Sequence, residues 1–413
     1  MVRLIFVNRY FSPDHSATSQ ILSDLAFHLA GLGRDVHIVA GTQIYDDPKA
    51  SLPEHEVIQG VNVHRVPSTR FGRGALAGRA IDYLSFFRSV RLRLLEIASA
   101  GDIVIAKTDP PLTSVVALEA TQRRSARLVN WLQDIYPETA VKLGVPLMRG
   151  PLAAGLAALR DRSLRRAVAT VVVGDLMGRK AAALGAAPEA IHVIPNWCDD
   201  EAIKPIPQGE NPLRRAWGLA DKFVVSYSGN LGRAHEYATV LAAAERLRHD
   251  QRIVFLVIGG GKGFEELSGI VEHRGIAGSF RFMPYQDQSM LPYSLGVADA
   301  HWLSLNPELE GLIVPSKFYG IAAAGKPIMV IGDTNGELAS LVGQHGCGFV
   351  LAPGDAEALT GGLRRMADDP EAVAAMGTRA RQMLDAQFTR QHGLARWRDL
   401  LDRLIVTELD SSR

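Results

Sequence analysis

A predicted helix near residue 316 carries residue types that suit a phosphate site. The helix is expected to begin near Pro315 or Ser316, to hold Lys317 in its first turn and to end near Gly325. A helix N-terminus offers free N–H groups and positive electrostatic potential, and a lysine there adds a full charge. We therefore expect Ser316 and Lys317 to bind a phosphate or a diphosphate.

The loop before this helix is acidic and contains a glycine. Glu308, Glu310 and Gly311 precede the helix, and carboxylates accept hydrogen bonds from hydroxyl groups. This loop could hold a sugar that is attached to the phosphate. Loop and helix together predict a nucleotide-sugar site, although a plain strand–loop–helix with a surface lysine has the same pattern.

Two glycine-rich turns follow predicted strands in the second half of the chain. In SGNLGR, residues 228–233, Gly229 and Gly232 let the backbone approach an anion, and Arg233 can pair with phosphate oxygens. Arg233 and Lys317 would then surround one diphosphate. A glycine turn with a surface arginine is the alternative.

The second turn, GGGKG at residues 259–263, matches neither a Walker A loop nor GxGxxG. Its glycines, Gly259, Gly260 and Gly261, could lie beside a nucleoside or form an ordinary strand-to-helix turn.

Polar residues also follow predicted strands in the first half. Asp14, His15 and Ser16 come after the first strand, where a loop could meet an acceptor or the diphosphate, although a solvated loop histidine is common. Lys107 opens a second such loop, KTDPP, which also fits a plain helix start.

A third loop of the first half, NWLQDIYPE at residues 130–138, contains two acids. Asp134 and Glu138 could accept hydrogen bonds from a sugar hydroxyl or take up its proton. Glu138 follows a proline, so it equally fits the first turn of a helix, where acids are favoured. Asp134 is therefore the preferred candidate.

Composition excludes several classes of protein. The 413 residues carry a net charge of +1, which gives no general attraction to nucleic acid. Cys198 and Cys347 form no CxxC pair, which argues against a zinc site or a disulfide framework. DxD and HExxH are absent, so we expect no metal and no other cofactor, and protein cations would have to neutralise a diphosphate.

The sequence predicts no membrane span, but it does predict a surface that could bind a membrane. The first residues lack the apolar core of a signal peptide, and no charge-free apolar run reaches 18 residues. The segment 65–93 interleaves aromatic residues with Arg65, Arg70, Arg73, Arg79, Arg88, Arg91 and Arg93, against the single acid Asp82. A basic amphipathic helix can lie on an anionic membrane, and a solvated outer helix is the alternative. The expected location is the cytoplasm, either free or peripheral on the inner face of the cell membrane.

Strand and helix patterns alternate twice along the chain. Strands are predicted near 3–8, 36–40, 61–66, 102–106, 127–132, 169–173 and 191–194. After a proline-rich linker at 195–212, they are predicted again near 223–228, 253–258, 279–283, 300–304, 327–331 and 347–350. Helical patterns, including about 236–249 and 262–274, separate most of them. We predict an α/β protein in which two doubly wound Rossmann-like domains face each other across a cleft.

Together these segments resemble family 4 of the retaining glycosyltransferases, which have the GT-B fold. The similarity is greatest to the bacterial exopolysaccharide and O-antigen branch, of colanic-acid or fucosamine-transferase type, and it extends over nearly the whole chain. It rests on RYFSPDHSATSQILSDLAFHLAGLGRDVHIV, KTDPPL, WLQDIYPE, VIPNW, YSGNLGRAHE, VIGGGK, LEGLIVPSKFYGIAAAGKP and the run GE…GCGF…PGD.

The resemblance implies a role for each domain. The first, residues 1–198 with a C-terminal crossover helix at about 389–413, would bind the acceptor. The second, residues 199–388, would bind the nucleotide sugar. Arg233 and Lys317 match the basic residues near the diphosphate, and the loop of Glu310, Gly311, Leu312 and Ile313 matches the one that holds the donor sugar. Glu337 matches a residue that contacts the nucleoside ribose.

Four departures from the family pattern stand out. A Glu–seven–Glu motif would fall on Leu312 and Gly320, so both glutamates are missing. Asn230 and His235 occupy the places of the usual arginine and lysine. Ser16-Ala17 replaces a double glycine, and the residues Gln133-Asp134 replace a histidine at the acceptor edge.

The resemblance implies a transferase that moves a sugar from a UDP- or GDP-sugar, without metal and with retention, to a glycan or polyprenyl-diphosphate-linked acceptor. Arg233 and Lys317 would stabilise the leaving diphosphate, Glu310 would orient the sugar, and Asp134 would orient or deprotonate the acceptor. A nucleotide-sugar epimerase and a non-catalytic assembly partner remain alternatives on the same fold.

Overall fold

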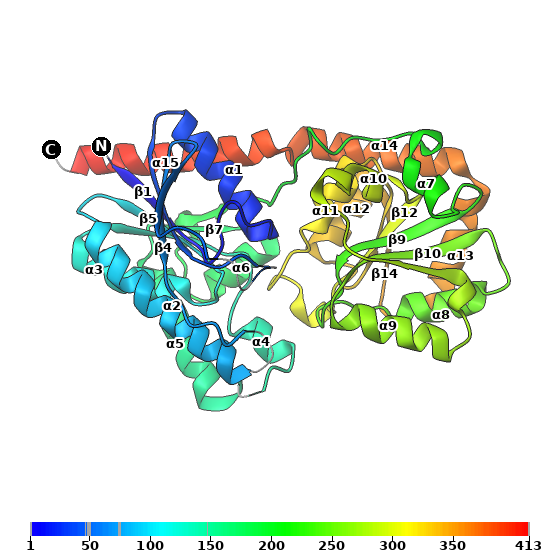
Figure 1. Ribbon diagram of the computed structural model, residues 1–413, viewed down its shortest axis with the longest axis horizontal. Helices are drawn as coiled ribbons and strands as arrows, with labels where there is room; N and C mark the ends of the chain where they lie inside the picture. Colours follow the sequence, from blue (N-terminus) through cyan, green and yellow to red (C-terminus); the bar gives the residue numbers. More distant parts are fainter. Residues whose placement is uncertain (1, 46, 48–50, 73–75, 147, 412–413) are drawn as a thin grey trace. The chain divides into compact units, whose positions relative to one another are not determined.

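The computed structural model describes residues 2–45, 47, 51–72, 76–146 and 148–411. The chain divides into two compact units, each with its own sheet (Figure 1). The first unit contains residues 1–195 and 393–413, and the second contains residues 196–392. Arg73, one of the arginines predicted to bind a membrane, lies outside the described residues.

The first unit is built on an eight-stranded sheet with the order β3-β4-β2-β1-β5-β6-β7-β8. All neighbouring strands are parallel except β3 and β4. The strands are β1 (Arg3–Val7), β2 (Asp35–Gly41), β3 (His55–Ile58), β4 (Val61–Val66), β5 (Ile103–Lys107), β6 (Arg127–Trp131), β7 (Ala169–Val172) and β8 (Ile191–Val193).

Helices cover both faces of this sheet. They are α1 (Ala17–Gly31), α2 (Leu76–Ile97), α3 (Thr113–Arg124), α4 (Glu138–Lys142), α5 (Gly150–Arg166), α6 (Asp175–Ala183) and α15 (Arg390–Ser411). Buried residues of α2 and α3, such as Phe86 and Ala117, form one core with the strands. The helix α15 joins this unit through Trp397, whose ring lies 4.5 Å from that of Trp131.

The second unit has a six-stranded parallel sheet with the order β11-β10-β9-β12-β13-β14. The strands are β9 (Phe223–Asn230), β10 (Ile253–Gly260), β11 (Phe280–Met283), β12 (Ala300–Ser304), β13 (Ile328–Ile331) and β14 (Gly348–Leu351). The helices are α7 (Pro212–Ala216), α8 (Ala238–Leu247), α9 (Lys262–His273), α10 (Leu291–Gly296), α11 (Lys317–Ala323), α12 (Glu337–His345), α13 (Ala356–Asp368) and α14 (Pro370–Gln387).

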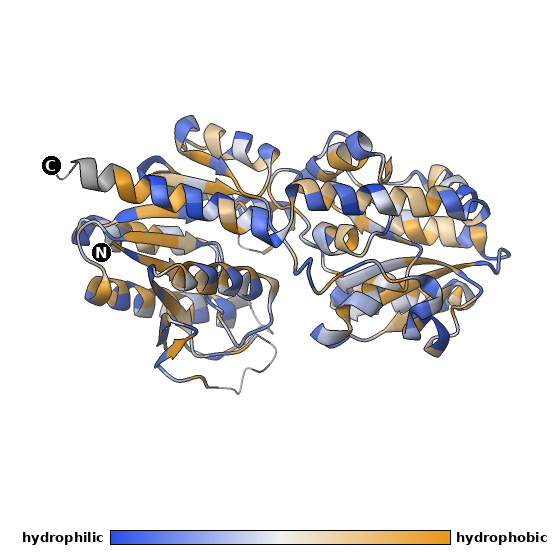
Figure 2. Cartoon of the chain, turned by 90° about the horizontal axis from the view of Figure 1, so that it is seen from above, coloured by the Kyte–Doolittle hydropathy of each residue, from blue (hydrophilic) through white to orange (hydrophobic). Residues whose placement is uncertain are grey.

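Apolar strands form the centre of each unit. Figure 2 shows the strands of both sheets largely in orange, whereas the outer helices alternate between orange and blue. In the second unit, α8, α9 and α13 contribute to the core on one face of the sheet, and α7 and α10 pack on a separate cluster. Burial on both faces explains why these strands are continuous apolar runs.

The polar loops that were singled out in the sequence follow the carboxyl ends of the strands in both sheets. In each sheet the strand order reverses at its first strand, between β1 and β5 and between β9 and β12. Ligands of open α/β sheets bind at such a reversal, outside the carboxyl ends of the strands. The architecture confirms the predicted α/β class with two doubly wound Rossmann-like units.

Two local expectations differ from the structure. The sequence analysis missed β3, a short antiparallel strand whose residues are exposed or half-buried, because HEVI carries little apolar signal. The proline-rich stretch is not a loose linker, because residues 196–212 belong to the second unit. There Arg381 donates hydrogen bonds to the backbone oxygens of Asp200 and Ile203.

The basic segment 65–93 covers the end of β4, the loop after it and most of the long helix α2, and its single acid has a structural role. Arg65 is buried in β4 and pairs with Glu56, so it is not part of an exposed basic helix. The Asp82 carboxylate accepts hydrogen bonds from the Thr69 hydroxyl and from the backbone N–H groups of Phe71 and Gly72. Asp82 therefore ties the preceding loop to the helix. In the described parts of the chain, every helix is too short or too polar to cross a bilayer.

Three histidines meet at the edge of the first sheet, and one of them predicts acid sensitivity. The Nε2 atom of His64 lies 2.9 Å from Nδ1 of His37, and the rings of His64 and His55 have centroids 5.1 Å apart. Burial, followed by the charges of His37, His55 and Arg93, lowers the pKa of His64 to about 4. Its neutral form is therefore favoured in the folded protein.

Because the pKa of His64 is depressed on folding, its contribution to stability is present above the unfolded value near ~6.5 and is lost as the pH falls towards 4. We expect His64→Gln to lower the acid-unfolding midpoint, measured by circular dichroism. His15→Gln, at an exposed loop histidine of the same unit, is the control and should leave the midpoint in place. Equal midpoints for His64→Gln and the unmodified protein would contradict this prediction.

Candidate functional site

Lys317 stands at the start of α11 and reaches to the carboxyl end of β9. Its Nζ donates a hydrogen bond of 3.3 Å to the backbone oxygen of Asn230. The same ammonium lies 5.0 Å from the centroid of the Tyr227 ring, within range of a cation–π interaction. The predicted helix and its lysine are therefore present, and Lys317 meets the glycine-rich turn after β9.

The glycines of the two turns make room for this arrangement. Gly229 has a φ of +123°, and a Cβ atom there would lie 2.4 Å from Cε of Lys317. A Cβ atom on Gly259 would lie 2.2 Å from the Gly229 oxygen, and one on Gly261 would lie 2.1 Å from Oδ1 of Asn230. We expected Gly229 to let an anion approach, but its immediate role is to let the lysine side chain pass.

Arg233 lies in the turn that follows β9, with an exposed side chain. The turn is closed by a hydrogen bond from the His235 N–H to the Gly232 oxygen. Lys317 contacts the start of this turn at Asn230. Lys317 thus contacts the residue that lies three positions before Arg233 in the chain.

The electrostatics of this region favour an incoming anion. Burial lowers the pKa of Lys317 to about 8. Burial, and then the charge of Lys317, lower the pKa of His235 to about 4. Nδ1 of His235 lies 2.8 Å from the Ser304 oxygen, and because a carbonyl only accepts, Nδ1 carries the proton. An anion would stabilise the charged form of Lys317.

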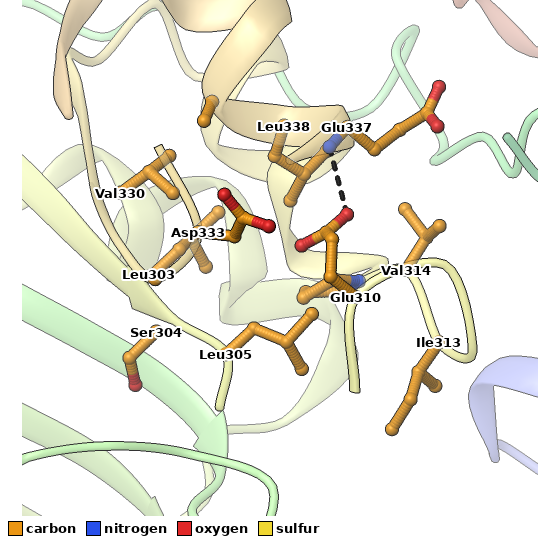
Figure 3. Close-up of a pocket in the computed structure, with 13 residues that line it drawn as sticks. Leu303, Ser304, Leu305, Glu310, Ile313, Val314, Val330, Asp333, Glu337 and Leu338 are labelled. Atoms are coloured by element: carbon orange, nitrogen blue, oxygen red, sulfur yellow. Dashed lines mark hydrogen bonds between the residues drawn. The ribbon is translucent and has the colours of Figure 1, made fainter. Parts of the chain in front are cut away.

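Glu310 lies beside a pocket at the ends of β12 and β13 (Figure 3). Its carboxylate accepts a hydrogen bond of 2.8 Å from the Glu337 N–H, at the start of α12. A Cβ atom on Gly336 would lie 2.6 Å from Oε2 of Glu310, so a larger residue there would displace the carboxylate. Glu310 therefore caps α12, a role that the sequence analysis did not predict.

The pocket beside Glu310 combines apolar walls with carboxylates. Burial, and then the nearby Asp333 and Glu337, raise the pKa of Glu310 despite the hydrogen bond from Glu337. The residues that line the pocket are Leu303, Ser304, Leu305, Glu310, Ile313, Val314, Pro315, Val330, Gly332, Asp333, Glu337, Leu338 and Ala339. Carboxylates accept hydrogen bonds from hydroxyl groups, and the apolar walls suit the faces of a sugar ring or a base.

Of the predicted sugar loop, Ile313 lines this pocket but Leu312 does not. The Leu312 side chain is buried in the protein, and Gly311 is buried with a φ of +70°. Any ligand contact from Gly311 or Leu312 would come from the backbone. Ser316 precedes α11 without a side-chain hydrogen bond to the helix end.

In the first unit, Asp134 borders a second pocket, of about 310 Å³. Its backbone N–H and that of Gln133 both approach the Thr108 hydroxyl, at 3.4 and 2.8 Å. Burial, and then the nearby Asp109, raise the pKa of Asp134 to about 7. A carboxyl group with that pKa can both give and take a proton near neutral pH.

The Glu138 side chain pairs with another side chain of the first unit. It opens α4, as its place after Pro137 suggested. Both of its carboxylate oxygens accept hydrogen bonds from the buried Arg160 guanidinium, at 2.6 and 3.0 Å. Glu138 therefore joins α4 to α5, and this contact favours the structural alternative for it.

Lys107 and Asp14 also have hydrogen-bond partners within the first unit. Nζ of Lys107 donates to the Thr18 oxygen at 2.8 Å and lies 4.1 Å from the Trp131 ring, and burial lowers its pKa to about 7. The Asp14 carboxylate accepts hydrogen bonds from the N–H and hydroxyl of Ser16. His15 is exposed beside them.

Three further residues were not singled out from the sequence. Asp109 is buried next to Lys107 and accepts a hydrogen bond from the Thr18 hydroxyl, and burial raises its pKa. Arg9 follows β1 and lies over the rings of Tyr10 and Tyr83. Tyr227 is buried within β9. A polar residue next to a strand end was the available signal for Arg9 and Asp109, whereas Tyr227 looks like an ordinary strand residue.

Among the residues described by the structure, no group of three or more metal-ligating side chains is arranged to hold a metal ion.

Two families of known proteins match the chain, one for each half. Residues 17–197 match the family described as "Glycosyl transferase 4-like domain". Residues 210–383 match the family described as "Glycosyl transferases group 1". The two matches meet near the boundary between the two units.

Curated relatives carry names of the same kind. The putative colanic acid biosynthesis glycosyl transferase WcaI of Escherichia coli is 29% identical over 58% of this chain and 60% of that protein. The probable glycosyltransferase WbjE of Pseudomonas aeruginosa is 24% identical over 87% of this chain and 88% of that protein. A GDP-mannose-dependent mannosyltransferase of Mycobacterium tuberculosis is 24% identical over 94% of this chain and 95% of that protein.

Solved structures share the fold at low identity. Sucrose-phosphate synthase from Thermosynechococcus elongatus has a TM-score of 0.78 at 15% identity, over 98% of this chain and 100% of that one. Anabaena HepE in complex with UDP has a TM-score of 0.71 at 15% identity, over 97% of this chain and 100% of that one. The similarity places the fold among the GT-B glycosyltransferases.

A substitution that adds one methyl group to Gly229 tests the importance of its contact with the Lys317 side chain. We expect Gly229→Ala to displace Lys317, because the new Cβ would overlap Cε and the φ of +123° is strained for alanine. Affinity for UDP or GDP, measured by calorimetry, should fall about tenfold or more, as for the loss of one charged contact.

Gly278→Ala is the matched control, because a Cβ atom there meets nothing within 4 Å. This variant should bind like the unmodified protein. Full affinity in Gly229→Ala would show that the position of Lys317 does not matter for binding.

Proposed function

The chain belongs to the glycosyltransferases that join a 4-like domain to a group 1 domain, and we propose that it transfers a sugar from a UDP- or GDP-sugar to a glycan acceptor. The observation that carries the proposal is the meeting of Lys317 with the glycine turn after β9. Lys317, in the first turn of α11, supplies a positive charge there, and Arg233 in the glycine turn would supply a second charge for a diphosphate.

The second unit would bind the donor. Lys317 and Arg233 would neutralise the diphosphate, and the backbone of the two glycine turns would line it. The pocket beside Glu310 would take the sugar or the nucleoside, since its acceptor oxygens suit hydroxyl groups. The residues proposed to contact the donor are Gly229, Asn230, Gly232, Arg233, Gly259, Gly260, Gly261, Glu310, Gly311, Leu312, Ile313, Ser316, Lys317 and Glu337.

The reaction would proceed with retention at the anomeric carbon. The bond from that carbon to the diphosphate oxygen breaks, and a bond to the acceptor oxygen forms on the same face of the sugar. The departing diphosphate assists removal of the acceptor proton, which passes either to a diphosphate oxygen or to the carboxylate of Asp134. Negative charge grows on the diphosphate as it leaves, so Lys317 and Arg233 would stabilise the transition state more than the bound donor.

The first unit would bind the acceptor near Asp134. Its pKa of about 7 allows the carboxyl group to hold the acceptor hydroxyl or to take its proton. The residues Asp14, His15, Ser16, Lys107 and Glu138 would shape the surroundings. The name of WcaI, a putative colanic acid biosynthesis glycosyl transferase, favours a role in bacterial polysaccharide synthesis. We propose a polyprenyl-diphosphate-linked glycan as the acceptor.

One departure from the family favours a second candidate. Leu312 and Gly320 stand where family 4 carries two glutamates, and a protein with this fold and without catalysis would serve as an assembly partner. An epimerase would also use this fold, but it would convert UDP-GlcNAc without any acceptor. Turnover that requires an acceptor separates the transferase from both alternatives.

Lys317 is expected to be essential for turnover. We predict that Lys317→Ala lowers kcat roughly 10²-fold or more, because it removes a charge that stabilises the leaving group. Lys222→Ala, at the opposite end of β9, should keep full activity.

Thermal-shift screening of nucleotide sugars first identifies the donor for this measurement, since a ligand that binds the folded state raises the melting temperature of the protein. An active Lys317→Ala variant would remove the basis of the proposal.

The helix α2 would attach the protein to the inner face of the cell membrane. Ile81, Leu84 and Leu92 are exposed on it, with Leu84 at 67%, and Arg88 is exposed between them. Apolar side chains flanked by arginines fit an anionic bilayer surface. We predict that the double substitution Leu84→Ser, Leu92→Ser reduces co-sedimentation with phosphatidylglycerol vesicles several-fold.

Val57→Ser is the control for this measurement, because Val57 is 68% exposed on β3 of the same unit. Its sedimentation should equal that of the unmodified protein. Equal losses in both variants, or binding that is the same on neutral vesicles, would argue against a role for α2.

A further inference from the structure

Tyr227 shares a hydrogen-bond acceptor with the lysine of the proposed donor site. Its hydroxyl donates to the Asn230 oxygen at 2.7 Å, and Nζ of Lys317 donates to the same oxygen at 3.3 Å. A carbonyl oxygen has two lone pairs and can accept both bonds. The tyrosine and the lysine therefore meet at one backbone atom, at the carboxyl end of β9.

The Tyr227 ring also forms the surface on which the ammonium lies. Nζ of Lys317 is 5.0 Å from the ring centroid. The ring is fixed in turn by Trp302, at 4.6 Å between centroids, and by the edge of His235, at 5.6 Å. Because Tyr227 is 1% exposed, this aromatic group is rigid compared with a surface side chain.

A lysine needs such a support to act as a fixed charge. Its long side chain has many rotamers in solution, and binding a ligand would otherwise have to offset the entropy lost by fixing one of them. In the described part of the chain, Lys317 has no carboxylate partner, and its recorded partners are the carbonyl and the ring. Neutral partners hold the ammonium in place without cancelling its charge.

The Tyr227 hydroxyl also matters when a ligand binds and Lys317 changes its hydrogen-bond partner. When a diphosphate draws Lys317 away from the Asn230 oxygen, that oxygen still accepts the Tyr227 hydroxyl. The bond from the Tyr227 hydroxyl is part-buried, so it holds the backbone at the end of β9 in place while Lys317 turns to the ligand.

We infer that Tyr227 is a positioning residue that acts through Lys317, with its ring holding the ammonium and its hydroxyl holding the acceptor that the ammonium leaves. The inference rests on the proposed function, in which Lys317 binds the diphosphate. Tyr227 itself touches neither the sugar nor the reacting atoms in this account.

A double-mutant cycle between Tyr227 and Lys317 tests the inference. The variants are Tyr227→Phe, Lys317→Ala and the two combined, and the readouts are the dissociation constant for UDP or GDP and kcat. Tyr227→Phe keeps the ring and removes only the hydroxyl, so the fold should survive, which circular dichroism checks. Tyr237→Phe is the control, because it removes a hydroxyl that bonds Glu266 at the surface of the same unit.

We expect Tyr227→Phe to weaken nucleotide binding and lower kcat about three- to tenfold, and to have no further effect once Lys317 is alanine. Tyr237→Phe should stay within twofold of the unmodified protein. A Tyr227→Phe variant that matches this control would overturn the inference alone, and so would equal losses with and without Lys317. Full activity of Lys317→Ala would overturn the proposed function and the inference together.

Discussion

The contact between the Lys317 ammonium and the backbone at the end of β9 is the interaction on which the second unit depends. A Cβ atom on Gly229 would overlap the lysine side chain, and one on Gly259 would overlap the Gly229 backbone. Gly261 in turn leaves space for the Asn230 side chain, which follows Gly229 in the chain. The lowered pKa of Lys317 reflects the burial that this arrangement imposes. A diphosphate would restore the charge that burial disfavours.

In the same unit, the Glu310 carboxylate is also held by a contact with the backbone beside a glycine. Glu310 caps α12 through the Glu337 N–H, and Gly336 leaves space for its carboxylate. The loop that precedes Lys317 is thereby attached to α12 at Glu310 before it continues into α11. In the first unit, burial together with Asp109 raises the pKa of Asp134, so the two units differ in the charge that they stabilise. One favours an anionic ligand, and the other favours a neutral hydroxyl.

The sequence was sufficient for the fold because the strands are buried on both faces and read as continuous apolar runs. It failed for β3, whose exposed residues carry no such signal. It also identified Lys317, because a lysine in a first helical turn is a local feature. The hydrogen-bond partners of the polar residues could not be predicted from the sequence. Glu310 meets Glu337, and Glu138 meets Arg160, through contacts between distant parts of the chain. Tyr227 shows no local sign that its hydroxyl shares an acceptor with Lys317.

The pKa of the Lys317 ammonium, followed by NMR with and without UDP or GDP, tests the central claim most directly. The account predicts a value of about 8 in the free protein and a clear rise when the nucleotide binds, since the diphosphate stabilises the charged form. Nucleotide binding that leaves the pKa of Lys317 unchanged would contradict it.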